Sequence, residues 1–177
     1  MGMEKAQRLD KILSMSGYGT RKEVKKLVKQ GSVTVNGAVA SDSGSQVVPG
    51  NDDIRVFGKA LDFYTYVYIM MNKPQGVLSS TRDGRETTVI DLLDGAFSHR
   101  KLFPAGRLDK DSEGLVLLTD DGTLAHRLLS PKRRVPKVYY VEAEGMMDEG
   151  DAKAFRAGID LGDFIALPAE LTLLGHG

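Results

Sequence analysis

The sequence predicts an α+β fold in which short helices pack against a mixed, mainly antiparallel sheet. Near the N-terminus, apolar residues recur at helical spacing, and Asn36-Gly37, the strongest short hairpin signal, follows an alternating run. Farther along, strand-like runs alternate with turn residues and short helical segments, which is typical of this class. We expect strands at 65–71, 114–119 and 137–144, and helices at 88–93, 123–129 and 148–157.

The first fifty-odd residues are expected to form a small module of two helices and a hairpin. Leu9 to Leu13 carry apolar residues at helical spacing, and Gly17 ends that helix. Thr20 and Glu23 fit a capping box, because the hydroxyl and the carboxylate satisfy free amides in the first turn of the second helix. Gly31 suits the end of that helix. We then expect strands at 32–35 and 54–57.

The composition is that of a soluble, globular protein without thiol chemistry. Of the 177 residues, 41% are hydrophobic and 27% are charged. The absence of Cys from the sequence excludes disulfides, thiolate metal sites and thiol nucleophiles. No apolar run approaches the roughly 20 residues that span a bilayer, and no signal peptide opens the chain. We therefore expect a cytoplasmic monomer with no membrane partner.

The net charge of zero hides a separation of charge along the chain. Residues 5–29 hold eight Lys and Arg against two acidic residues, a net of +6, whereas residues 138–177 carry a net of −6. Charge segregated in this way suggests that one face meets a polyanion. Like charges at i, i+4 spacing weaken a helix, and its dipole disfavours cations near its start. The cations at 21–29 therefore indicate either a bound anion or an ordinary solvated helix face.

The most informative stretch runs from 105 to 122 and is rich in carboxylates. Its acidic residues fit an EF-hand calcium loop, starting at Asp109 and ending at Asp120. Against calcium, Pro104 and Gly106 break the helix that should lead into such a loop, and residues 115–118 read as a buried strand.

Two further interpretations of the same stretch use no metal. Asp109 and Asp111 resemble a carboxylate pair for glycosidic hydrolysis, although side chains two residues apart diverge unless the backbone turns sharply. A solvated acidic turn before a core strand accounts for residues 111–113. It accounts poorly for Asp109, which Leu108 and the Gly106-Arg107 turn should place at the wall of the domain.

Specific motifs give the N-terminal module a resemblance to a known RNA-binding domain. They resemble the small domain named after ribosomal protein S4, which places its second helix and the following hairpin against RNA phosphates. The matching residues are Arg8-Leu9-Asp10-Lys11, Gly17, Thr20-Arg21, Gly31 and Val35-Asn36-Gly37.

The rest of the chain resembles the RNA pseudouridine synthases. Gly106-Arg107-Leu108-Asp109, Ser112, Gly114 and Thr119-Asp120-Asp121-Gly122 are similar to the signature loop of that family. An S4-like domain ahead of this core is the layout of the branch that includes RsuA and RluB. The other matching stretches are Met71-Asn72-Lys73-Pro74-Gln75-Gly76, Ser130-Pro131 with Lys132, Arg133 and Arg134, and Lys137-Val138-Tyr139.

The resemblance implies a catalytic site without a metal or an organic cofactor. It assigns Asp109 as the nucleophile, Tyr139 as the platform that stacks on a flipped uracil, and Arg107 as a phosphate or base contact. We therefore expect Asp109 to line a cavity that admits a pyrimidine. Charge and resemblance together predict RNA contacts by Arg8, Lys11, Arg21, Lys22, Lys25, Lys26, Lys29, Asn36, Lys73, Lys132, Arg133, Arg134 and Lys137.

These patterns predict the organisation and the substrate of the chain. We expect an RNA-binding domain at 1–58, a linker at 59–64 and a catalytic domain at 65–177 that lacks the family's C-terminal Gly-Arg-x-His-Gln-like motif. Ser130-Pro131 and Lys137-Val138-Tyr139 resemble the enzymes that act on 16S ribosomal RNA more than those acting on 23S. The alternatives are a 23S enzyme and a non-catalytic protein that binds ribosomal RNA or the ribosome.

Overall fold

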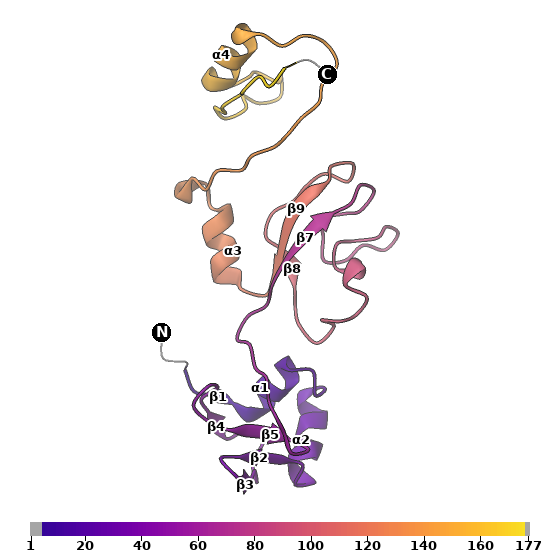
Figure 1. The fold of residues 1–177 in the computed structure, drawn as a ribbon, viewed down its shortest axis with the longest axis vertical. Coiled ribbons are helices and arrows are strands. Elements are labelled where there is room, and N and C mark those ends of the chain that lie inside the picture. The colour runs from indigo at the N-terminus through magenta and orange to yellow at the C-terminus, as the bar shows by residue number, and fades with distance from the viewer. Residues whose placement is uncertain (1–4, 176–177) are drawn as a thin grey trace. The chain divides into compact units, whose positions relative to one another are not determined.

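The computed structural model describes residues 5–175 and confirms the α+β class (Figure 1). The chain divides into two compact units, residues 5–135 and 136–175. The helices are short, and no helix among the described residues is long and apolar enough to cross a membrane.

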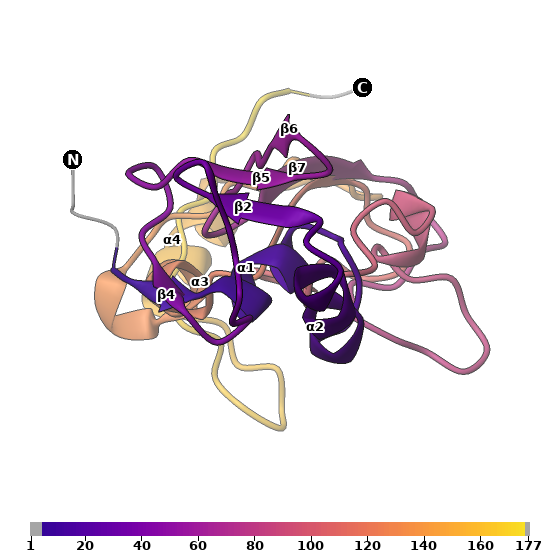
Figure 2. The ribbon, with the colours of Figure 1, turned by 90° about the horizontal axis from the view of Figure 1, so that it is seen from below.

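Two helices cover one face of a small antiparallel sheet in the N-terminal part of the first unit. Figure 2 shows the helices and the sheet as two layers. Strands β2 and β5 form the centre of the sheet, whose order is β3-β2-β5-β6, and β1 pairs separately with β4. Apolar residues from both layers form one buried core that includes Leu9, Val24 and Val56. The elements are β1 (Gln7–Arg8), α1 (Leu9–Met15), α2 (Arg21–Lys29), β2 (Val33–Val35), β3 (Ala38–Val39), β4 (Gln46–Val47), β5 (Ile54–Val56) and β6 (Lys59–Ala60).

The predicted local signals are present at the expected positions. The Thr20 hydroxyl accepts a hydrogen bond from the Glu23 amide, and the Glu23 carboxylate accepts one from the Thr20 amide, which completes the capping box. Asn36 and Gly37 both have positive φ, as a tight hairpin between β2 and β3 requires. Strand β6 occupies positions 59 and 60, at the start of the predicted linker.

A second antiparallel sheet organises the rest of the first unit. Strand β9 (Gly114–Thr119) lies between β7 (Tyr68–Lys73) and β8 (Phe103–Pro104). The inner face of this sheet packs on Val77 and Val89, whereas Met70 of β7 and Leu115 of β9 point outward and are 80% and 71% exposed. The predicted helix at 88–93 is only a 3₁₀ turn, η1 (Asp91–Leu93). Helix α3 (Gly122–Leu129) and a 3₁₀ turn, η2 (Pro131–Arg133), follow β9.

The second unit contains the predicted helix but not the predicted strand. Helix α4 (Glu149–Ala157) begins at a capping box formed by Asp148 and Asp151. Residues 137–144 form no strand and are exposed, so the prediction of a strand there is wrong for this structure. A strand needs a neighbour that takes its amides and carbonyls, and among residues 136–175 the only pairing is the isolated bridge between Asp160 and Ile165.

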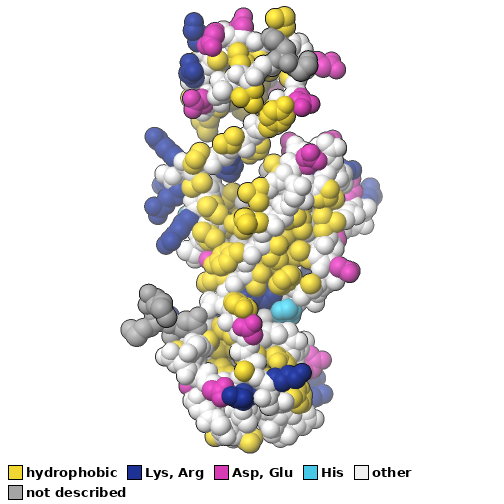
Figure 3. All heavy atoms as spheres, in the orientation of Figure 1, with side chains coloured by type: hydrophobic (Ala, Val, Ile, Leu, Met, Phe, Trp, Pro, Cys, Tyr) yellow, Lys and Arg dark blue, Asp and Glu magenta, His cyan; other side chains and the backbone are white. Residues whose placement is uncertain are grey.

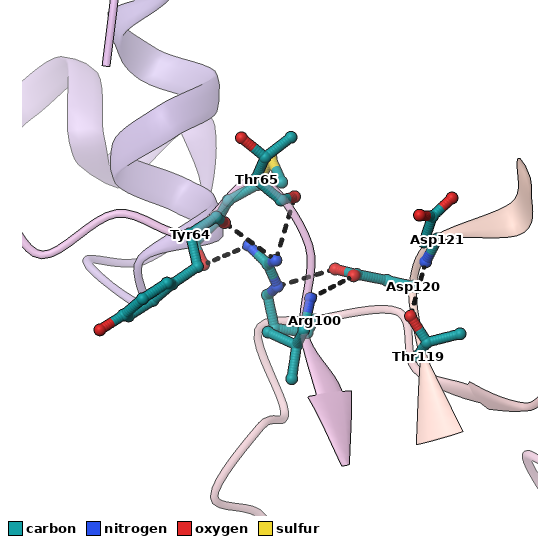
Figure 4. A network of polar contacts seen from close by, with 8 residues as sticks. Tyr64, Thr65, Arg100, Thr119, Asp120 and Asp121 are labelled. Atoms are coloured by element: carbon teal, nitrogen blue, oxygen red, sulfur yellow. Dashed lines mark hydrogen bonds and ion pairs between the residues drawn. The ribbon is translucent and has the colours of Figure 1, made fainter. Parts of the chain in front are cut away.

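A buried arginine joins helix α1 to the sheet of β7, β8 and β9 in the first unit (Figure 4). The side chain of Arg100 is 3% exposed, and its Nε lies 2.8 Å from a carboxylate oxygen of Asp120. That Nε–H is not aligned for a hydrogen bond, so the contact is an ion pair. The terminal nitrogens donate hydrogen bonds to the carbonyls of Met15, Tyr64 and Thr65 at 3.1–3.2 Å. One side chain thus links α1, the segment before β7 and the end of β9.

Replacing Arg100 should therefore destabilise the first unit strongly. Arg100→Ala leaves the carboxylate of Asp120 without its cation, and we expect the free energy of unfolding to fall by about 3–5 kcal/mol. Urea denaturation followed by circular dichroism measures this change. The matched control is Arg55→Ala, because the Arg55–Asp53 ion pair has the same chemistry and is about half exposed. The control should cost less than about 1 kcal/mol, and equal costs for the two variants would contradict this role of Arg100.

Candidate functional site

The loop from 105 to 113 connects β8 to β9 and presents the residue that the motif singles out. Gly106 has a φ of +117°, a conformation that side chains with a Cβ rarely adopt, and this reverses the chain after β8. Leu108 then packs against the core of the second sheet. Adjacent side chains on an extended backbone point in opposite directions, so burial of Leu108 directs Arg107 and Asp109 outward.

The buried side chain of Lys73 anchors this loop by hydrogen bonds. Its amine lies inside the protein, with no exposed surface, and donates hydrogen bonds to the carbonyls of Pro74, Lys110 and Ser112 at 3.0, 3.1 and 2.6 Å. All three N–H donors are used, so Lys73 has none left for a phosphate. The prediction that Lys73 contacts RNA is therefore wrong for this structure, because the fold buries this cation beneath the loop instead of exposing it.

Ser79 and Gly76 form further hydrogen bonds with the backbone of this loop, at the residues that flank Asp109. The Ser79 hydroxyl donates to the Leu108 carbonyl at 2.8 Å and accepts from the Leu108 amide at 3.0 Å. The Gly76 amide donates to the Lys110 carbonyl at 2.8 Å. The backbone is thus anchored immediately before and immediately after Asp109.

The side chains of this loop contrast with its anchored backbone. Asp109 and Arg107 are both exposed, and no other described residue forms a hydrogen bond or an ion pair with either side chain. Lys110 pairs with Glu86 at 2.8 Å, and this hydrogen bond raises the pKa of Lys110. The loop therefore offers an unpaired carboxylate and an unpaired guanidinium on a fixed frame.

The structure does not support a calcium loop at this position. An EF-hand would bring Asp109 and Asp120 to one ion, but the six-residue strand β9 separates them by a span of about 20 Å at the usual rise of a strand. Among residues 5–175 there is no group of three or more His, Cys, Asp or Glu side chains arranged to hold a metal ion. Asp120 instead pairs with Arg100.

The expectation that Asp109 lines a pyrimidine-sized cavity stays a prediction. Two cavities in the first unit lie near His99, and Asp109 lines neither of them. Tyr139 belongs to the second unit, where its side chain is 61% exposed.

The structure places most predicted RNA-binding residues on exposed surface. The basic residues of α2 are exposed, and Val24 and Val28 on its opposite side are buried. Figure 3 shows further basic side chains gathered around η2, beside the hydrophobic face of the second sheet. Those on or next to η2 are Lys132, Arg133 and Arg134, all exposed, and Lys137 is exposed in the second unit.

Three of the predicted RNA contacts also have partners within the fold. Arg8 donates two hydrogen bonds to the buried carboxylate of Asp10, at 3.2 and 2.7 Å, and these lower the pKa of Asp10. The amide of Asn36 donates to Asp52 and accepts from the amide of Asp53, which ties the hairpin to the chain before β5. Lys11 donates to Gln7 at 2.9 Å.

Sequence reasoning missed the residues that hold this site together. Arg100 reads as one of several basic residues before β8, and Ser79 as part of a polar loop. Asp121 is a better case, since an Asp one residue before a helix is a recognisable cap. Its carboxylate accepts hydrogen bonds from the amides of Thr123 and Leu124 and from the hydroxyl of Tyr68. These bonds lower the pKa of Asp121, with the Leu124 amide contributing most.

Comparison with known families matches two separate stretches of the chain. Residues 67–163 match the RNA pseudouridylate synthase family, and residues 7–54 match the S4 domain. The first match contains the Asp109 loop, and the second contains α1, α2 and the hairpin.

Individual relatives agree with these matches. The chain is 49% identical over 164 residues to YtzG of Bacillus subtilis, described as an uncharacterized RNA pseudouridine synthase, with 92% of this chain and 69% of that protein covered. It is 42% identical over 160 residues to an uncharacterized RNA pseudouridine synthase of Mycobacterium tuberculosis, covering 88% of this chain and 63% of the relative. It is also 34% identical over 168 residues to ribosomal large subunit pseudouridine synthase B of Bacillus subtilis, covering 95% of this chain and 68% of that protein.

A solved structure shares the fold. A crystal structure described as a pseudouridylate synthase aligns with a TM-score of 0.50 and 31% sequence identity, covering 95% of this chain and 73% of the other. The chain spans about two thirds of the length of the curated relatives it matches, from 60% for a protein of Aquifex aeolicus to 69% for YtzG. From the family match, these identities and the shared fold, the chain belongs to the RNA pseudouridylate synthase family, in the form that carries an S4 domain.

Proposed function

We propose that this protein converts a uridine of ribosomal RNA to pseudouridine, with Asp109 as the nucleophile. The observation that carries the proposal is the contrast at residue 109 between an anchored backbone and an unpaired side chain. The backbone on both sides of Asp109 is anchored by Lys73 and Ser79, whereas its carboxylate has no partner among the described residues. A reactive group on a rigid frame is what catalysis requires, because it loses little orientational freedom when substrate binds.

The reaction needs a nucleophile that can hold one fragment while the other turns. The bond between ribose C1′ and N1 of uracil breaks, the base rotates, and C1′ then bonds to C5. The proton of C5 is lost to solvent, and N1 gains a proton, so the reaction involves no net oxidation and no hydrolysis. A carboxylate can attack either C1′ or C6 of the ring, and each route splits one difficult step into two easier ones. Neither route calls for a metal or an organic cofactor.

Two further side chains are proposed to act on the flipped base. The target uridine must leave the RNA stack, which costs a few kcal/mol. Stacking on Tyr139 recovers about 1–3 kcal/mol by analogy with other contacts between a base and an aromatic ring. Arg107, which is exposed beside Asp109, contacts a phosphate or fills the space that the base leaves.

The basic surfaces are proposed to position the RNA without reading its sequence. Residues 1–58 form the RNA-binding domain, residues 59–64 the linker and residues 65–177 the catalytic domain. Exposed cations on α2 and around η2 contact phosphates, which supplies affinity and register. The protein acts as a cytoplasmic monomer, in the compartment where ribosomal RNA is made.

The substrate is proposed to be ribosomal RNA, with 16S tested first. One curated relative is named as a ribosomal large subunit pseudouridine synthase, which supports ribosomal RNA as the class. Ser130-Pro131 and Lys137-Val138-Tyr139 favour the small subunit by resemblance, whereas the name of that relative favours 23S. Assays on fragments of both RNAs distinguish the two.

One observation favours a second candidate function. Asp109 is exposed and lines neither of the two cavities near His99 in residues 5–135. A protein that binds ribosomal RNA without modifying it would need the basic surfaces and not the cavity. Tight RNA binding by this chain, with no pseudouridine formed, would favour that alternative.

Substitution of the nucleophile should abolish activity and spare the fold. For Asp109→Asn we expect pseudouridine formation to fall by at least ~10⁴-fold, as when other enzymes lose a nucleophile. The melting temperature should stay unchanged, because the carboxylate has no partner to lose. Asp111→Asn is the matched control, and it should keep most of the activity. Full activity of Asp109→Asn on a ribosomal RNA fragment would eliminate this mechanism.

Removing the amine beneath the loop should damage the site and leave RNA affinity intact. Lys73→Met keeps the apolar stem but leaves the carbonyls of Pro74 and Ser112 without a donor, because the Lys110 carbonyl still accepts from the Gly76 amide. We expect about 1–3 kcal/mol of destabilisation. Faster hydrogen exchange at the Gly76 and Ser112 amides and lower activity should accompany it. Lys110→Met, which breaks only the exposed pair with Glu86, is the stability control. Loss of RNA affinity without loss of stability would restore Lys73 as a phosphate contact.

The basic face of α2 should contribute much of the salt dependence of RNA binding. Replacing Lys22, Lys25, Lys26 and Lys29 by Gln should lower the slope of log Kobs against log salt by about 0.7–0.9 for each phosphate that the helix no longer neutralises. Fluorescence anisotropy with a labelled ribosomal RNA stem-loop measures the slope. Lys153→Gln, on α4 in the acidic part of the chain, should not change it. An unchanged slope in the α2 variant would mean that this face is only solvated.

A further inference from the structure

A cavity of about 520 Å³ lies within the first unit where its N-terminal helices meet the segment before β8. This volume is within the range of about 300–1,000 Å³ usual for ligand sites. The family matches assign the cavity itself no role, although the S4-like motifs predict RNA contacts for two of its lining residues, Lys11 and Arg21. Its lining residues are Lys11, Ser14, Met15, Arg21, His99, Arg100, Lys101 and Asp120.

On the inner wall of this cavity, opposite charges are paired and the side chains are bonded to the rest of the fold. Arg100 is buried, and its charge is matched by Asp120 at 2.8 Å. It also donates to the Met15 carbonyl, so the wall joins α1 to the second sheet. The ring of His99 lies close to Gly17, where a Cβ would stand 3.4 Å from Nδ1. The opposite sides of the cavity are thus held together by the fold.

The rim, by contrast, carries an excess of positive charge. Lys11, Arg21 and Lys101 are all exposed, and none forms an ion pair with another residue of the described chain. Lys11 gives one hydrogen bond to Gln7, which leaves two N–H donors free.

The carboxylate of Asp10, which is close enough to Arg21 for its charge to act on it, already has its own partner. Asp10 accepts both hydrogen bonds from Arg8, and these lower its pKa more than the nearby charge of Arg21 does. The rim therefore has three cations that the protein itself does not neutralise.

We propose that this cavity binds one phosphodiester group of the substrate RNA, between Lys11 and Arg21 on one side and Lys101 on the other. The inference rests on the proposed function only in taking RNA as the ligand. Three cations from separate segments that line one cavity, opposite the charge-balanced pair of Arg100 and Asp120, suit a compact anion such as phosphate. The hydroxyl of Ser14 supplies a further donor.

The location gives this phosphate a specific consequence. Lys101 is two residues before β8, which leads directly into the Asp109 loop, whereas Lys11 and Arg21 belong to the RNA-binding helices. A phosphate held between them fixes the RNA to both parts at once. The register of the RNA relative to the Asp109 loop would then be set at this cavity and not by α2 alone.

Neutralising the rim tests the proposal through RNA binding, independently of catalysis. For Lys11→Gln and Lys101→Gln we expect roughly tenfold weaker binding of a ribosomal RNA stem-loop at 0.1 M salt, and a salt slope lower by about 0.7–0.9. Lys101→Arg should retain the affinity, because it keeps the charge. Lys153→Gln is the matched control on exposed surface outside the cavity, and melting temperatures should match in all variants.

The outcomes separate failure of this inference from failure of the proposed function. If Lys11→Gln and Lys101→Gln bind RNA as tightly as Lys153→Gln does, the cavity is not a phosphate site, whether or not pseudouridine forms. If they bind weakly while the unmodified protein makes no pseudouridine, the phosphate site stands and the enzymatic proposal fails.

Discussion

The ion pair between Arg100 and Asp120 is the interaction on which the rest of the first unit depends. Arg100 precedes β8 and Asp120 follows β9, so the pair closes the base of the hairpin-like segment whose far end carries Asp109. The same guanidinium holds a carbonyl of α1. A buried pair of this kind contributes little net stability over an apolar substitute, but the loss of one partner is costly. Its main effect is to specify how the RNA-binding helices meet the second sheet.

At the candidate site, buried side chains anchor the backbone around Asp109 and leave the Asp109 side chain unpaired. Lys73 and Ser79 donate hydrogen bonds to backbone carbonyls near Asp109, whereas the carboxylate itself is left without a partner among the described residues. The side chains that hold the loop are thus bonded to the backbone, whereas the side chain proposed to react is exposed and unpaired. The rim of the cavity near His99 follows the same rule, since its wall is balanced and its outer cations are not.

Local signals in the sequence predicted the elements that depend on local physics. The capping box of Thr20 and Glu23 and the hairpin at Asn36 both depend on residues close in sequence, and both are present. The strand at 114–119 is also present, and there the alternating pattern has partners in β7 and β8. The burial of Lys73 could not be predicted, because its three carbonyl partners are brought together only by tertiary structure. The strand expected at 137–144 failed for the related reason that alternation indicates a strand only where a pairing partner exists.

The central claim is that the carboxylate of Asp109 acts on a uridine removed from its RNA stack. A crystal structure of Asp109→Asn bound to a ribosomal RNA stem-loop that contains the target uridine examines this most directly. The account predicts that the uracil is flipped out, with ribose C1′ or ring C6 within about 3.5 Å of the side chain at position 109. A uridine that stays stacked in the RNA, with position 109 facing solvent, would contradict the account and leave only the RNA-binding function.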